Sequence, residues 1–130
     1  MKSAAIILRT DAEIKKLRES NLIVAEVLEV LKGIVEPGIT TMDLERACVK
    51  ELKKRDNKVK AAFKGYRGFP ACLCTSVNEE VVHGMPTDKK VLKNGDILSV
   101  DFGVEYNGYY GDSAFTVPVG DVSDEAKKLM

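Results

Sequence analysis

The chain has 130 residues, 45% of them hydrophobic, and its 20 basic and 20 acidic side chains give a formal net charge of zero. This size and apolar content predict one domain, residues 1–130, with a core of its own. The charge balance excludes a global field that would attract nucleic acid or an anionic membrane, and no apolar run approaches the length of a membrane span. We therefore expect neither nucleic acid nor a membrane among the partners.

The three cysteines are Cys48, Cys72 and Cys74. An odd number argues against a disulfide framework, and Cys72-x-Cys74 lacks the Cys-x-x-Cys spacing that is typical of zinc and redox sites. We expect all three to be buried free thiols in a cytoplasmic protein.

The first predicted helix begins at Thr10, because Thr10 and Glu13 have the spacing of a capping box. Apolar residues then recur at helical spacing, which favours an amphipathic helix. The polar Asn21 interrupts this stripe. Its apolar members are Ile14, Leu17, Val24, Leu28 and Leu31.

A second helix is predicted after the chain-breaking residues Glu36-Pro37-Gly38. Thr40 or Thr41 can cap this helix. Residues 53–60 form a charged stretch that we interpret as its solvated end and turn, and residues 71–77 read as a strand. The buried face of the second helix would include Leu44, Ala47, Cys48 and Leu52.

Residues 97–119 predict a β-hairpin around Asn107-Gly108. This pair tolerates positive φ at both centres of a two-residue turn. If these two residues form the loop, Tyr106 lies opposite Tyr109. The same register then places Gly103 opposite Asp112, and Asp101 opposite Ala114.

The hairpin predicts a metal site. Side chains alternate along a strand, so Asp101 and Asp112 emerge on one face as diagonal neighbours. Two carboxylates so placed can share a cation, and without one their like charges would repel. Gly103 leaves the space between them uncrowded. The alternative is that this pair of aspartates is only part of the solvated surface.

Two helices followed by antiparallel strands predict an α+β fold with the helices packed on one face of the sheet. Ser123 and the acidic residues after it are typical of a helix start, and only about two helical turns follow. We expect the sequence to be part of a longer protein or a shortened form of one.

Two motifs precede the two aspartates of the hairpin: Thr-Ser-Val-Asn-Glu-Glu-Val-Val-His-Gly-Met-Pro over residues 75–86, and Gly95-Asp96. In this order the motifs closely resemble type I methionine aminopeptidases, and the resemblance runs from about Ile6 to the last residue. It implies half of a pita-bread fold, in which two pseudo-symmetric halves clasp a two-metal site. The implied reaction is hydrolysis of the first peptide bond of a nascent protein that begins with methionine.

The resemblance also implies roles for single residues. Asp101 would bind one ion bidentately, and Asp112 would bridge two ions, which could be Co²⁺, Mn²⁺, Fe²⁺ or Zn²⁺. His83 would hydrogen-bond the substrate near the scissile amide. Phe63 stands where some members carry a cysteine. The pocket for the methionine side chain would be lined by Phe63, Tyr66, Phe69 and Cys74.

The family's other metal ligands, one histidine and two glutamates, belong to the second half of the fold. The only histidine in this sequence is His83, so none remains to bind metal. Two carboxylates alone would bind a divalent ion weakly. We therefore expect little or no activity from this chain alone, and either a homodimer or a companion C-terminal half as its partner.

Two other readings remain open. A prolidase-type peptidase shares the Asp-x-Gly hairpin, although the stretch from Asn78 to His83 and the lack of a preceding extra domain count against it. A pita-bread half could also act as a non-catalytic, self-associating scaffold. The retained Asp101, Asp112 and His83 argue against a lineage that abandoned catalysis.

Overall fold

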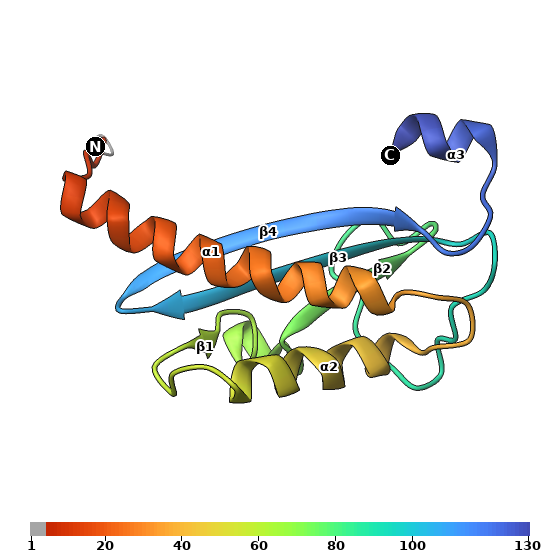
Figure 1. Ribbon diagram of the computed structural model, residues 1–130, viewed down its shortest axis with the longest axis horizontal. Coiled ribbons are helices and arrows are strands. Elements are labelled where there is room, and N and C mark those ends of the chain that lie inside the picture. The colour runs from red at the N-terminus through yellow and green to blue at the C-terminus, as the bar shows by residue number, and fades with distance from the viewer. Residues whose placement is uncertain (1–4) are drawn as a thin grey trace.

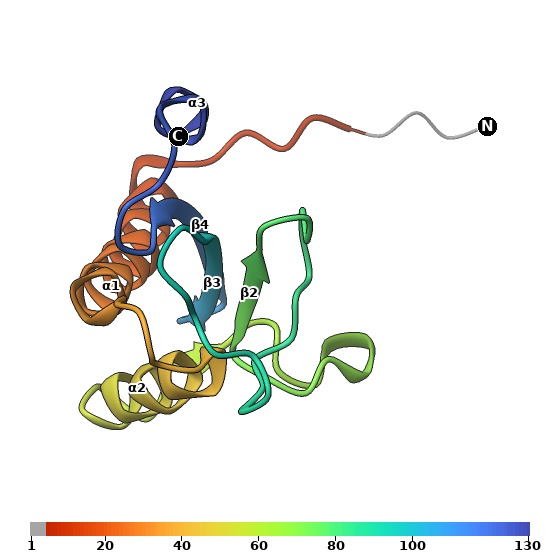
Figure 2. The ribbon, with the colours of Figure 1, turned by 90° about the vertical axis from the view of Figure 1, so that its right-hand side faces the viewer.

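The computed structural model describes residues 5–130 and has the predicted α+β architecture. Helices α1 and α2 lie side by side on one face of an antiparallel sheet, and the loops around η1 and after β2 lie on the other side (Figures 1 and 2). The elements are α1 (Asp11–Ile34), α2 (Thr41–Lys53), β1 (Lys60–Ala61), the 3₁₀ turn η1 (Tyr66–Gly68), β2 (Leu73–Val77), β3 (Ile97–Tyr106), β4 (Tyr109–Pro118) and α3 (Asp124–Leu129).

Helix α1 begins with the predicted capping box. Thr10 accepts a hydrogen bond from the backbone of Glu13 (3.2 Å), and Glu13 accepts one from the backbone of Thr10 (3.0 Å). Ile14 in the first turn is 42% exposed, whereas Val24 and Leu31 are fully buried, because the later turns cover the sheet (Figure 1). Within the described residues, no helix is long and apolar enough to cross a membrane.

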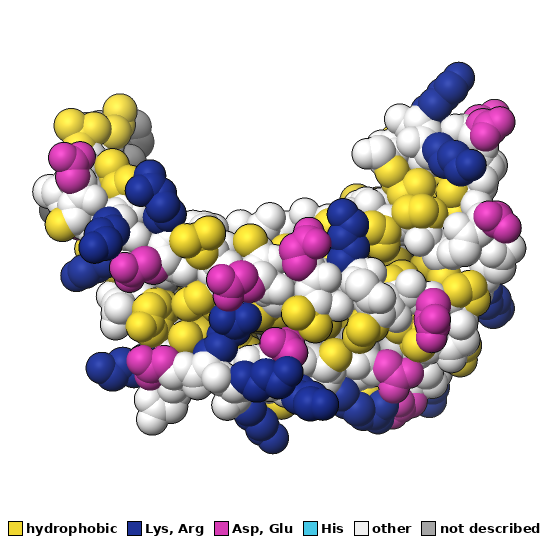
Figure 3. Space-filling model, in the orientation of Figure 1, with side chains coloured by type: hydrophobic (Ala, Val, Ile, Leu, Met, Phe, Trp, Pro, Cys, Tyr) yellow, Lys and Arg dark blue, Asp and Glu magenta, His cyan; other side chains and the backbone are white. Residues whose placement is uncertain are grey.

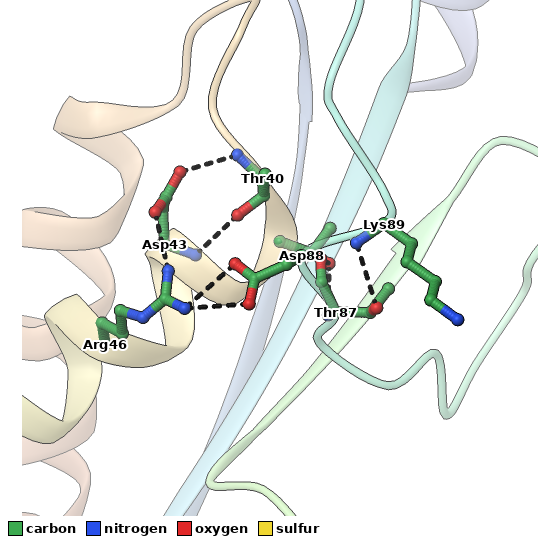
Figure 4. Close-up of polar contacts among 7 residues, drawn as sticks. Thr40, Asp43, Arg46, Thr87, Asp88 and Lys89 are labelled. Atoms are coloured by element: carbon green, nitrogen blue, oxygen red, sulfur yellow. Dashed lines mark hydrogen bonds and ion pairs between the residues drawn. The ribbon is translucent and has the colours of Figure 1, made fainter.

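Helix α2 is capped by Thr40 rather than by Thr41. The Thr40 hydroxyl accepts a hydrogen bond from the backbone N–H of Asp43 (3.1 Å). The Asp43 carboxylate in turn accepts one from the backbone N–H of Thr40 (2.8 Å). Arg46 reaches from α2 to both Asp43 (3.1 Å) and Asp88 (2.9 Å), as Figure 4 shows. These contacts tie the start of α2 to the loop that precedes β3.

Strand β3 is central, with β4 on one side and β2 and β1 along the other. The predicted hairpin register is confirmed, since Tyr106 pairs with Tyr109 and Gly103 with Asp112. Asn107 and Gly108 both have positive φ, at 53° and 80°. Every second residue of β3 faces the helices, and the core there includes Leu98, Val100, Phe102 and Val104, all buried.

A buried carboxylate joins α2 to β2. Glu45 is only 8% exposed and accepts hydrogen bonds from the backbone N–H groups of Cys72 (2.8 Å) and Leu73 (3.0 Å). The predicted strand 71–77 begins two residues later than expected, at Leu73. Glu45 therefore fixes the point at which the chain enters β2.

We expect Glu45→Ala to lower the free energy of unfolding by about 2–4 kcal/mol, because it leaves two buried N–H groups without an acceptor. Urea unfolding measures this loss. The matched control is Glu29→Ala on the exposed side of α1, which should change stability by less than about 0.5 kcal/mol. Equal losses in the two variants would contradict this role.

Candidate active site

The two aspartates of the hairpin share the sheet face opposite the helices. Asp101 pairs directly with Cys74 of β2 and with Ala114 of β4, and Gly103, two residues on, pairs with Asp112. Directly paired residues point to the same face, as do alternate residues of one strand. Asp101, Asp112 and Cys74 therefore converge on one side of three adjacent strands.

The carboxyl group of Asp101 is in an unusual environment. One of its oxygens, Oδ1, is buried without a hydrogen-bond partner. Burial, together with the hydrogen bond and the charge of the neighbouring Asp112 carboxyl, raises the pKa of Asp101 to about 7. A buried, unpartnered carboxylate oxygen beside a second carboxylate is the arrangement that a bound cation would satisfy.

Cys74 borders the aspartates as a neutral thiol. It is 6% exposed, and burial, reinforced by the charges of Asp101 and Asp112, raises its pKa to about 11. A thiol of this kind is protonated at neutral pH and is not a thiolate metal ligand. It offers instead a soft, polarisable surface.

A pocket of about 650 Å³ opens over the aspartates. All seven residues singled out from the sequence line it, and residues 66–70 of the loop around η1 contribute to its lining. The Phe63 ring lies over Gly103, where a Cβ atom would come within 3.0 Å of it. The seven residues are Phe63, Tyr66, Phe69, Cys74, His83, Asp101 and Asp112.

Arg67 and Met85 are among the pocket residues that the sequence analysis did not single out. Arg67 lies 5.3 Å from the centroid of the Tyr66 ring, in a left-handed conformation with φ of 50°. Met85 is 59% exposed and follows His83 in the same loop. In the sequence, only their position could have pointed to them, since each lies within two residues of a predicted site residue. Both add surface for a ligand beyond the predicted pocket.

The loop that carries His83 is anchored at both ends. Asn78 donates to Asp96 (2.9 Å) and accepts from the backbone of Ile97 (3.0 Å) at one end. At the other end the Thr41 hydroxyl donates to the carbonyl of Thr87 (3.1 Å) and accepts from its N–H (2.9 Å). This loop therefore has little freedom to leave the pocket.

The structure explains why Asn21 interrupts the apolar stripe of α1. Its side-chain oxygen accepts a hydrogen bond from the backbone of Asp112 (3.2 Å), and the preceding Ser20 donates to the carbonyl of Tyr109 (2.9 Å). The helix approaches so closely that a Cβ atom on Gly111 would lie 2.7 Å from the backbone of Ser20. Polar residues of α1 thus hold the strand beside Asp112.

Within residues 5–130, no group of three or more His, Cys, Asp or Glu side chains is arranged to hold a metal ion. The aspartate pair fits a divalent cation by its chemistry, because carboxylates are hard ligands that suit such ions. The chain supplies two candidate ligands and leaves the remaining coordination positions to water or to a partner.

An antiparallel sheet backed by two helices, with paired carboxylates on its open face, is the arrangement of a candidate metal-dependent site. The chain belongs to metallopeptidase family M24, whose family model matches residues 15–130.

Within this family the chain is similar to methionine aminopeptidases. The enzyme of Clostridium acetobutylicum is 49% identical over 125 residues, which are 96% of this chain and 49% of that protein. The enzyme of Aquifex aeolicus is 49% identical over 132 residues, covering 97% of this chain and 50% of that protein. The chain thus spans about half the length of the curated relatives it matches.

Solved structures of methionine aminopeptidases also resemble this chain. The crystal structure of the Thermotoga maritima methionine aminopeptidase superposes with a TM-score of 0.90 at 44% identity, covering 96% of this chain and 49% of that one. An Xaa-Pro dipeptidase of Bacillus anthracis is more distant, with a TM-score of 0.73 and 25% identity over 92% of this chain and 32% of that one. The resemblance to prolidase-type enzymes is therefore the weaker one, and the expected half of a pita-bread fold is confirmed.

Proposed function

We propose that the chain, as one domain, provides the N-terminal half of a metal-dependent methionine aminopeptidase. The observation that carries this proposal is the buried, unpartnered Oδ1 atom of Asp101 beside Asp112, at the base of a pocket with aromatic walls. Asp101 and Asp112 hold divalent ions, two in the complete site. The three buried free thiols, Cys48, Cys72 and Cys74, suit the reducing conditions of the cytoplasm.

Divalent ions such as Co²⁺, Mn²⁺, Fe²⁺ or Zn²⁺ in such a site supply Lewis acidity and lower the pKa of a bound water. The chain's own residues hold the ions and bind the substrate. Asp101 and Asp112 would hold these ions in the pocket that both side chains line. His83, on the loop beside them, hydrogen-bonds the substrate near the scissile amide.

The pocket suits an N-terminal methionine. Phe63 and Phe69 are half-buried and offer apolar ring surface, and the neutral thiol of Cys74 lines the same pocket. A thioether gains about 0.3–1.5 kcal/mol from each favourable sulfur–aromatic contact. The exposed Tyr66 ring adds a third aromatic side chain to the lining.

The metal site is tested by calorimetric titration of Mn²⁺ at pH 7.5. We expect saturable binding with a dissociation constant on the order of 0.1–1 mM, because two carboxylates leave most coordination positions to water. Asp112→Asn should abolish measurable binding. Asp121→Asn, which changes an exposed aspartate outside the pocket, should leave it unchanged. Binding that survives Asp112→Asn would contradict the proposal.

A companion second half of the fold completes the metal site. Where that half is absent, a second copy of the chain binds at the surface that the second half would cover. Among the described strands, β4 pairs only with β3, so no further strand covers its other edge, which α1 contacts at Tyr109 and Asp112. In Figure 3 the surface is hollowed above this strand, between the start of the chain and α3. The segment before α1 and helix α3 also carry apolar side chains that are each more than 70% exposed: Ile6, Ile7, Leu8 and Leu129.

Sedimentation of the dilute chain tests this second copy. We expect a dimer with Mn²⁺ and a larger monomer fraction with EDTA, since two copies about a two-fold axis would bring four carboxylates together, and metal would relieve their repulsion. A compact monomer under both conditions would overturn the dimer and leave only the companion half.

A further inference from the structure

The backbone of Gly84, the residue after His83, is bonded to strand β2 on both sides of its Cα atom. The N–H of Gly84 donates to the side-chain hydroxyl of Ser76 (3.1 Å), and the carbonyl of Gly84 accepts from the N–H of Thr75 (2.8 Å). Ser76 is only 4% exposed. This pair of bonds lays the loop against the edge of β2 that does not pair with β3.

The fit at this point is too close for any side chain. A Cβ atom on Gly84 would lie 2.1 Å from the carbonyl oxygen of Thr75. His83 itself has a φ of 60°, in the left-handed region that a residue with a side chain rarely adopts. A conformation of this kind persists only where the surroundings enforce it.

Ser76 directs its hydroxyl to this loop rather than to the pocket. It pairs with Ser99 across the sheet and shares the face of Cys74 and Asp101, yet it is not among the residues that line the pocket. Ser99 makes a different contact, a bond of 2.7 Å to Thr116 on the far side of β3. The two serines occupy paired positions, and only Ser76 touches the loop.

We infer that Ser76 is a positioning residue for His83. Its hydroxyl holds the His83–Gly84 peptide against β2, and this keeps the His83 backbone left-handed and its side chain at the pocket that contains Asp101 and Asp112. The inference rests on the proposed role of His83 at the substrate. Ser76 itself is not among the residues that line the pocket.

Two nuclear magnetic resonance measurements test this inference. Hydrogen exchange of the Thr75 amide reports opening of the loop, because its acceptor is the Gly84 carbonyl. Broadening of the imidazole signals by Mn²⁺ reports the distance of the ring from the aspartate pair. His83 is the only histidine of the sequence, so its ring signals need no further assignment.

Ser76→Ala should lower the hydrogen-exchange protection of the Thr75 amide by about 2- to 12-fold. This factor corresponds to the net free energy that one hydrogen bond contributes. It should also weaken the Mn²⁺ broadening of His83. Ser99→Ala, the matched control in the paired position, should change neither. Ser76→Thr keeps the hydroxyl and should restore both readouts, whereas Gly84→Ala should displace the loop.

Unchanged protection and unchanged broadening in Ser76→Ala would overturn the inference, as would equal effects of Ser99→Ala. If Mn²⁺ fails to broaden His83 in the unaltered chain, the proposed metal site is wrong. The Thr75 amide then still decides whether Ser76 holds the loop. Circular dichroism of each variant identifies any that fails to fold. If Ser76→Ala does not fold, the inference is decided by comparing Ser76→Thr, which should keep both readouts, with Gly84→Ala, which should lose them.

Discussion

Joined to the part of the Clostridium acetobutylicum methionine aminopeptidase that it does not match, the chain should release methionine from a Met-initiated peptide when Mn²⁺ or Co²⁺ is present. The chain alone should show little or no turnover. The reason is the number of ligands, since residues 5–130 bring no third acidic, histidine or cysteine ligand to the aspartate pair. A two-metal site needs ligands on several sides to fix its ions and orient the attacking water.

In this chimera Asp112→Asn should lower kcat/KM by at least about 100-fold, because partners that only orient the ligands already cost 10- to 100-fold when removed. The matched control is Asp121→Asn, which should change kcat/KM by less than about twofold. Robust turnover by the chain alone that Asp112→Asn abolishes would show that no second half is needed. An inactive chimera that folds and binds Mn²⁺ would contradict the proposed activity.

The part of the site that could be predicted from the sequence depends on residues that lie close together in the chain. Asn107-Gly108 fixes the turn, the turn fixes the register, and the register places Asp101 and Asp112 on one face. Each of these steps spans only a few residues. The pocket residues came from the resemblance to a family, and the structure brings all of them to one cavity.

The contacts that support the site join residues far apart in the chain, and no local pattern reveals them. Glu45 bonds the backbone 27 and 28 residues further on. Asn21 meets Asp112 across 91 residues, so in the sequence it is only a polar break in an apolar stripe. The partners in each case are backbone N–H groups, which every residue except proline carries, so the sequence cannot single them out.

Without metal, the chain should lose stability as the pH rises from about 4 to about 7. The pKa of Asp101 is raised to about 7 in the folded protein, chiefly by burial and also by its hydrogen bond to Asp112 and by that residue's charge. In the unfolded chain an aspartate has a pKa near 3.9. Between these values the folded state holds a proton that the unfolded state has released, and the free energy of unfolding therefore falls with rising pH.

Asp101→Asn removes this dependence, because an amide carries no charge at any of these pH values. In EDTA the variant should be more stable than the unaltered chain at pH 8 by about 1 kcal/mol, a value reduced for solvent screening of a half-buried group. At pH 4 the two should be about equally stable. Urea unfolding at pH 4, 6 and 8 measures the difference, with Asp121→Asn as the control.

Parallel stability curves for the two proteins from pH 4 to 8 would show that the folded state does not hold this proton. With Mn²⁺ the order at pH 8 should reverse, since the ion binds the unaltered folded chain and stabilises it by mass action. These results together would show that the unaltered chain is less stable at pH 8 because it keeps an ionisable pair in its pocket. A strained pair that only a ligand relieves is a mark of a functional site rather than of a structural one.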